Sequence, residues 1–140
     1  MSAPMILIVE DNAANLELAQ ALLEVEGFMV LSASDALTGG RLARQYRPDL
    51  ILMDISLPGT DGLAATRQLK RDPATAGIPV VALTAHAMSG DEPAALLAGC
   101  DGYLSKPINT RTFTCSVRAW LKPPRAAFLA DQPQTQVTTI

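Results

Sequence analysis

Five short apolar runs, separated by segments of helical periodicity, constrain the fold of this chain more than any other feature of its sequence. The runs span residues 5–9, 28–31, 50–53, 80–83 and, more weakly, 103–104. The first, third and fourth are nearly continuous in Ile, Leu and Val, which is typical of strands buried on both faces of a parallel sheet. An order of strand and helix repeated five times predicts a doubly wound (βα)5 protein of the α/β class.

The segments between the runs predict the helices of this fold. Helices are expected over residues 13–26, 35–45, 62–71, 90–97 and 110–121. Asn12 is the expected N-cap of the first helix and Ser34 that of the second. The glycine pair Gly39–Gly40 weakens the second helix by about 1 kcal/mol per residue relative to alanine. For the parallel five-stranded sheet we expect the strand order 2-1-3-4-5.

Length and charge limit the domain organisation. The chain has 140 residues, which suits one domain, here residues 1–122, followed by a tail over 123–140 that shows no clear period. A net charge of −3 does not suggest a basic face for nucleic acid.

No apolar run is long enough to span a membrane, and the amino terminus lacks the basic region of a secretory signal, so we expect a cytoplasmic protein. Cys100 and Cys115 are read as reduced thiols in or near the core.

Polar and charged side chains follow four of the five predicted strands. Glu10 and Asp11 follow the first, Asp54 ends the third, Thr84 ends the fourth and Lys106 comes after the fifth. Carboxyl ends of parallel strands lie at one edge of the sheet, where α/β proteins bind ligands. Three carboxylates so close together repel one another unless a cation offsets their charge. Their oxygens suit Mg²⁺, with Mn²⁺ as a possible substitute.

This set of groups favours phosphoryl chemistry. Asp54 is short and central, so its carboxylate can act as a nucleophile that forms an acyl phosphate. The Thr84 hydroxyl can donate a hydrogen bond to a phosphoryl oxygen, and Lys106 supplies a positive charge. Each of these residues alone would be an ordinary strand-end or surface residue, and only their predicted co-location indicates a site. The single histidine, His86, is read as a loop residue rather than a catalyst.

Four motifs in this order resemble the receiver domain of two-component response regulators, the CheY-like family. They are ILIVEDN, PDLILMDISLPGTDG, VVALTAHAM and GYLSKPI, and the resemblance covers residues 5–121. It implies a flavodoxin-like fold and a phosphorylatable signalling module. The last 16 residues are too few for a DNA-binding output domain, so we expect the module to act by protein contact. The wording LTAHAM and SKPI is similar to single-domain receivers and to the receiver modules of hybrid sensor kinases.

The resemblance also implies roles for the strand-end residues. Asp54 would accept a phosphoryl group from the phosphohistidine of a sensor histidine kinase or histidine phosphotransferase. The implied Mg²⁺ ligands are Glu10, Asp11, Asp54 and the backbone carbonyl of Ser56. Thr84 and Lys106 would contact the phosphoryl group. The protein would then catalyse only its own phosphorylation and dephosphorylation.

Two surfaces follow from the same resemblance. Thr84 and Tyr103 would move together on phosphorylation and reshape the face of the fourth helix, fifth strand and fifth helix, where a downstream target binds. The phosphodonor would dock on a rim formed by Ala14, Leu18, Pro107 and Ile108. Within this rim, Pro107 would follow a cis peptide bond. The alternative, that Leu18 packs on the sheet and does not contact the phosphodonor, carries nearly equal weight.

Other functions remain open at this level. The first alternative is an aspartyl-phosphate phosphatase, but such enzymes usually carry a second acid two residues after the nucleophile, where this chain has Ser56. A second is a receiver-like scaffold that only binds proteins, which the intact set Asp54, Thr84 and Lys106 disfavours. A dinucleotide-binding relative is disfavoured because the first strand–helix turn, EDNAAN, contains no glycine.

Overall fold

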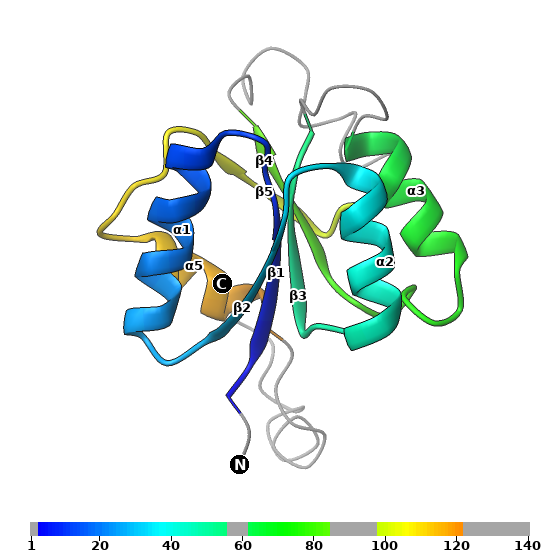
Figure 1. The fold of residues 1–140 in the computed structure, drawn as a ribbon, viewed down its shortest axis with the longest axis horizontal. Coiled ribbons are helices and arrows are strands. Elements are labelled where there is room, and N and C mark those ends of the chain that lie inside the picture. The colour runs from blue at the N-terminus through cyan, green and yellow to red at the C-terminus, as the bar shows by residue number, and fades with distance from the viewer. Residues whose placement is uncertain (1–2, 56–61, 85–97, 122–140) are drawn as a thin grey trace, which may run out of the picture.

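A five-stranded parallel sheet forms the centre of the protein (Figure 1). The computed structural model describes residues 3–55, 62–84 and 98–121. The strands are β1 (Met5–Val9), β2 (Met29–Ala33), β3 (Leu50–Asp54), β4 (Val80–Thr84) and β5 (Gly102–Ser105). Their order, β2-β1-β3-β4-β5, confirms the predicted doubly wound, flavodoxin-like fold.

Helices cover both faces of the sheet. The described helices are α1 (Ala13–Val25), α2 (Ala36–Tyr46), α3 (Gly62–Arg71) and α5 (Phe113–Trp120). In Figure 1, α1 and α5 lie on one side of the sheet, and α2 and α3 lie on the other. The helix expected over 90–97 and the tail over 123–140 fall outside the described residues. None of the described helices is long and apolar enough to cross a membrane.

The core lies on both faces of the three central strands. All residues of β3 and β4 are buried, which explains their unbroken apolar sequence. Alternate β1 residues point to opposite faces, so Ile6 and Ile8 pack on the side of α1 and α5. Leu7 and Val9 pack on the side of α2 and α3. The sheet is therefore held rigidly between its helices, and its carboxyl edge can position side chains.

The helix starts agree with the sequence in one case and differ in another. Asn12 caps α1 as expected, since its side-chain oxygen accepts a hydrogen bond from the Asn15 N–H at 2.9 Å. For α2 the prediction of Ser34 was wrong, because Asp35 is the cap and accepts from the Thr38 N–H at 2.7 Å. This bond holds the pKa of Asp35 below its usual value. Asp35 stands three residues before Thr38, which places its carboxylate within reach of that N–H.

The helix α5 (Phe113–Trp120) is shorter than predicted, and one of the two cysteines expected in or near the core lies on the surface. α5 begins at Phe113 rather than at 110, because Asn109 organises a turn in which its side chain accepts from the Arg111 N–H at 2.9 Å. Cys100 is buried, as expected, but Cys115 is exposed. Cys115 lies two residues from the buried positions Phe113 and Val117, so helical geometry turns it away from the sheet.

Candidate functional site

Three carboxylates meet at the carboxyl ends of β1 and β3. These two strands are neighbours in register, with Val9 opposite Met53, so the residues that follow them come together. One oxygen each of Glu10, Asp11 and Asp54 lies within 4.8 Å of the others. Glu10 is 2% exposed and Asp54 is 1% exposed, whereas Asp11 is exposed. The predicted acidic cluster is therefore present, and most of it is shielded from water.

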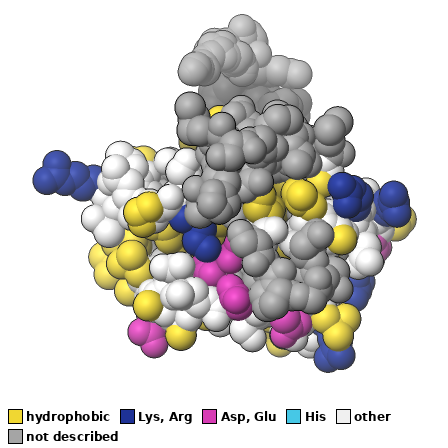
Figure 2. Space-filling view, turned by 90° about the horizontal axis from the view of Figure 1, so that it is seen from above, with side chains coloured by type: hydrophobic (Ala, Val, Ile, Leu, Met, Phe, Trp, Pro, Cys, Tyr) yellow, Lys and Arg dark blue, Asp and Glu magenta, His cyan; other side chains and the backbone are white. Residues whose placement is uncertain are grey.

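Lys106 joins two of these carboxylates. Its Nζ lies 3.1 Å from Glu10 Oε1 and 3.2 Å from Asp54 Oδ2. The lysine follows β5, and its backbone N–H donates to the Thr84 carbonyl at 2.7 Å, which extends the sheet beyond the strand end. The Lys106–Pro107 peptide is cis, as the sequence resemblance implies. Figure 2, which looks onto this end of the molecule, shows acidic side chains beside a basic one near the centre.

The charges in this cluster do not fully compensate one another. Burial raises the pKa of Glu10, and the contact with Asp54 raises it further. Burial alone would lower the pKa of Lys106, but its bonds to Glu10 and Asp54 raise that pKa above the usual value. Among the described residues, one ammonium therefore serves two buried carboxylates, while the exposed Asp11 adds a third carboxylate. A hard divalent cation fits this set, because all the donors are oxygens and negative charge remains to be offset.

Thr84 and Tyr103 lie on adjacent strands. Leu83 pairs with Asp54, so Thr84 is one residue beyond the level of Asp54, and it is fully buried. Tyr103 is opposite Ala82 in the register of β4 and β5 and is half-buried. Since side chains two residues apart share a face of the sheet, Tyr103 and Thr84 point to the same face. That geometry brings together the two residues expected to move together.

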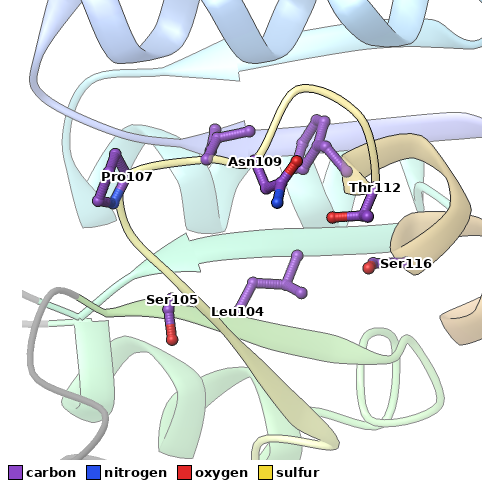
Figure 3. A pocket seen from close by; sticks show the side chains of 8 residues that line it. Leu104, Ser105, Pro107, Asn109, Thr112 and Ser116 are labelled. Carbon is purple, nitrogen blue, oxygen red and sulfur yellow. The ribbon is translucent and has the colours of Figure 1, made fainter.

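The four expected rim residues differ in exposure. Ala14 and Pro107 are exposed, and Leu18 is 40% exposed on the outer side of α1. Leu18 is thus a surface residue rather than a core residue. Ile108 is half-buried and packs against the apolar core on the side of the sheet that carries α1. A cavity of about 230 Å³ opens beside Pro107, between the end of β5 and α5 (Figure 3).

Gly62 contributes to the site in a way that sequence reasoning missed. A Cβ at Gly62 would collide with the Asp54 carbonyl oxygen and lie 2.7 Å from Ile55 Cα. The first turn of α3 thus presses on the backbone that carries Asp54, and the buried Thr66 hydroxyl donates to the Gly62 carbonyl at 2.8 Å. Glycine is a poor helix former, so its place at a helix start was the available signal. Ser56 and His86 lie outside the described residues.

Comparison with known proteins agrees with this geometry. The family model described as the response regulator receiver domain matches residues 6–118. The polar-differentiation response regulator DivK of Brucella anthropi is 44% identical over 116 residues, which cover 83% of this chain and 94% of DivK.

Solved structures give the same assignment. The receiver domain of a sensor histidine kinase from Pseudomonas aeruginosa PAO1, with a magnesium ion coordinated in its active site cleft, is 36% identical. It has a TM-score of 0.79, and the match covers 85% of this chain and 98% of that one. A response regulator structure from Chloroflexus aurantiacus is 26% identical with a TM-score of 0.80, and the match covers 84% and 97% of the two chains. From its fold, its motifs and these relatives, the chain belongs to the response regulator receiver domain family of two-component signalling.

Proposed function

We propose that this receiver accepts a phosphoryl group on Asp54 from the phosphohistidine of a sensor histidine kinase or histidine phosphotransferase. Its output is contact with other proteins rather than binding of DNA. The observation that carries the proposal is the position of Lys106 Nζ, 3.2 Å from Asp54 and 3.1 Å from Glu10 in a largely buried acidic cluster. The folded receiver is assigned to residues 1–122, and residues 123–140 to a tail.

The transfer is a single displacement at phosphorus. A carboxylate oxygen of Asp54 attacks, the bond from phosphorus to the histidine nitrogen breaks, and the electron pair returns to the imidazole ring. Lys106 stays beside the Asp54 carboxylate and offsets the negative charge that the phosphoryl group brings. Thr84, at the end of the neighbouring strand, donates its hydroxyl hydrogen to a phosphoryl oxygen.

A divalent cation belongs to this proposal. Glu10, Asp11, Asp54 and the Ser56 backbone carbonyl would hold it. Mg²⁺, or Mn²⁺ in its place, supplies positive charge that offsets the repulsion between the carboxylates and the phosphoryl oxygens. The raised pKa of Glu10 supports this assignment, because buried carboxylates without enough countercharge resist ionisation.

The two other readings have weaker support. A phosphatase of the aspartyl-phosphate type needs an acid two residues beyond the nucleophile, and Ser56 offers none. A scaffold would not require Lys106 to bridge two buried carboxylates. The receiver function therefore remains the proposal.

The test of this function is metal-dependent self-labelling. Incubation of the purified chain with acetyl phosphate and Mg²⁺ is expected to add one phosphoryl group, read by intact-mass spectrometry. Removal of the metal with a chelator is expected to stop labelling, since the uncompensated carboxylates repel the incoming dianion. Labelling that proceeds equally well in chelator, or that never occurs with Mg²⁺ present, would contradict the proposal.

Phosphorylation is expected to move Thr84 and Tyr103 together. The two side chains share a face of the sheet, so a Thr84 hydroxyl drawn toward the phosphoryl group leaves space that Tyr103 can enter. The target-binding face of the fourth helix, fifth strand and fifth helix would change with them. Amide exchange over residues 84–105 should change when a phosphoryl mimic such as beryllofluoride binds with Mg²⁺. Unchanged exchange in this segment would refute the switch.

The phosphodonor is proposed to dock on the rim formed by Ala14, Leu18, Pro107 and Ile108. Leu18→Glu is expected to slow phosphotransfer from the cognate kinase by about tenfold, because a charge replaces an exposed apolar contact. Labelling by acetyl phosphate and the Tm should stay near wild type, since Leu18 is 40% exposed.

A matched control for Leu18→Glu is Met29→Glu. Met29 is also exposed, but it lies at the opposite end of the sheet, at the start of β2. This variant should transfer normally. Equal loss of both labelling reactions in Leu18→Glu, or a large fall in its Tm, would show that Leu18 belongs to the core.

A further inference from the structure

A groove between α2 and α3 is not used by the proposed phosphotransfer. It contains a hollow of about 130 Å³ lined by Ala36, Leu37, Ala65 and Gln68. Leu37, on the α2 wall, is 66% exposed. The groove lies on the side of the sheet opposite α1 (Figure 1).

Gly40 lies one turn of α2 beyond Ala36 and Leu37, which line the hollow, and the packing of the described residues does not explain why it is a glycine. Its neighbour Gly39 is needed for packing, because a Cβ there would lie 2.7 Å from a methyl carbon of Val9. Among the described residues, a Cβ at Gly40 would meet nothing closer than the Arg44 guanidinium, at 3.7 Å. Glycine weakens a helix relative to alanine, so this chain carries a helix-destabilising residue that its own packing does not require. A missing side chain lets another helix approach α2 closely.

Two arginines of α2 flank the groove between α2 and α3. Arg41 and Arg44 are exposed and follow Leu37 and Gly40 by four residues, so each lies one turn further along the same side of α2. Asp35 is near Arg41, whereas Arg44 forms no ion pair within the described part of the chain. Figure 2 shows basic side chains beside hydrophobic ones at the edge of the molecule that carries these helices. The groove therefore has a mainly apolar lining and a positively charged rim on its α2 side, which suits an acidic amphipathic helix.

The outer side of α1 has the complementary character. Its exposed apolar stripe consists of Ala14, Leu18, Ala21 and Val25, spaced by four, three and four residues along one line of the helix. Val25 is 83% exposed. Glu17 and Glu24 are exposed along one edge of the stripe, and α1 contains no basic residue. Small residues alternate with larger ones, so the stripe can pack closely over a glycine.

We propose that α1 of one molecule docks in the α2–α3 groove of a second copy, with the apolar stripe over Gly40 and Leu37. Glu17 and Glu24 then face the arginines of the rim. The two surfaces lie on opposite sides of the sheet, so a molecule cannot satisfy its own groove. The contact is head-to-tail and leaves one free α1 and one free groove in each assembly, so it can repeat.

The association has a consequence that rests on the proposed function. The amino-terminal half of the stripe, Ala14 and Leu18, is also the proposed docking surface of the phosphodonor. Self-association and phosphotransfer from a kinase would then exclude one another, whereas acetyl phosphate would still reach Asp54. The association itself does not depend on phosphorylation, so each proposal can fail while the other holds.

Sedimentation velocity on the full chain tests the association. One helix in one groove is a small interface, so we expect a dissociation constant on the order of 100 µM. The weight-average mass should rise with protein concentration at low ionic strength and fall at high salt, because the ion pairs are screened. A mass that stays monomeric up to about ten times that concentration would overturn the proposal.

Charge reversal identifies the two surfaces. Arg44→Glu should remain monomeric because its groove rim repels α1, and Glu17→Lys/Glu24→Lys should remain monomeric because its α1 is repelled by the rim. Mixed together, the two variants should associate, since one supplies an intact α1 and the other an intact groove. Arg111→Glu, with the same charge change outside both surfaces, should associate like wild type. Association that survives Arg44→Glu, or a mixture that stays monomeric, would exclude this contact.

Gly40→Ala separates docking from folding. Alanine should raise the Tm by about 2–5 °C, because it favours the helix and has space for its methyl group. The same methyl group should weaken self-association by about tenfold, because it holds the incoming helix away. A variant that gains stability and associates as strongly as wild type would show that α1 does not pack over Gly40.

Discussion

Asp54→Asn is expected to reduce phosphoryl incorporation from acetyl phosphate by about 100-fold or more. The amide has nearly the shape of the carboxylate, but it is a poor nucleophile toward phosphorus and carries no charge for Lys106 or a metal ion. The loss should appear in the rate and in the final extent of labelling, both read by intact-mass spectrometry with Mg²⁺ present.

The fold should survive this substitution. In the native protein Asp54 raises the pKa of Glu10, so its charge disfavours ionisation of its neighbour. Removing that charge leaves Lys106 paired with Glu10 at 3.1 Å, and the Tm should not fall below that of wild type.

Asp49→Asn is the matched control for Asp54→Asn. Asp49 precedes the same strand at its other end and accepts a hydrogen bond from the Met5 N–H, which an asparagine side chain can still accept. Its labelling should equal that of wild type. Full labelling of Asp54→Asn would move the acceptor to another residue.

Much of the fold could be predicted because its signals are local in the sequence. Strands β3 and β4 are buried throughout, so their apolar runs stand out without knowledge of any neighbour. Once the strand order is expected, the carboxyl ends of β1 and β3 must be adjacent, and the acidic cluster follows. The candidate site was therefore predictable from strand ends alone.

Other features depend on packing that the sequence pattern does not show. Nothing near Gly62 in the sequence shows that a Cβ at this position would collide with the backbone of Asp54 and Ile55. The lining of the groove comes from two helices, and only the packing of α2 beside α3 brings Leu37 near Ala65 and Gln68. Ser34 and Asp35 are both residue types that cap helices. Only the backbone geometry shows that the Asp35 carboxylate is the one that accepts from the Thr38 N–H.

Two helical glycines show why residue type alone does not give the role. Gly62 and Gly40 both weaken a helix in principle. The structure separates them, because a methyl group at Gly62 meets backbone atoms, whereas at Gly40 the one described group that it meets is a flexible arginine side chain. Opposite effects on stability are therefore expected from the same substitution.

Gly62→Ala is expected to destabilise the protein by about 2–3 kcal/mol, the size of an overpacked core site. Its methyl group would press on the Asp54 carbonyl oxygen and Ile55 Cα, and backbone cannot rotate away as a side chain can. The start of α3 must then move off the end of β3, which shifts Asp54 relative to Lys106 and also slows labelling by acetyl phosphate. Urea unfolding measures the first effect and the labelling rate of the folded variant the second. Gly40→Ala serves as the control, since it should gain about 1 kcal/mol and label normally. If Gly62→Ala were as stable as wild type and labelled at the same rate, the close contact between α3 and the strand that carries Asp54 would have no role in positioning it.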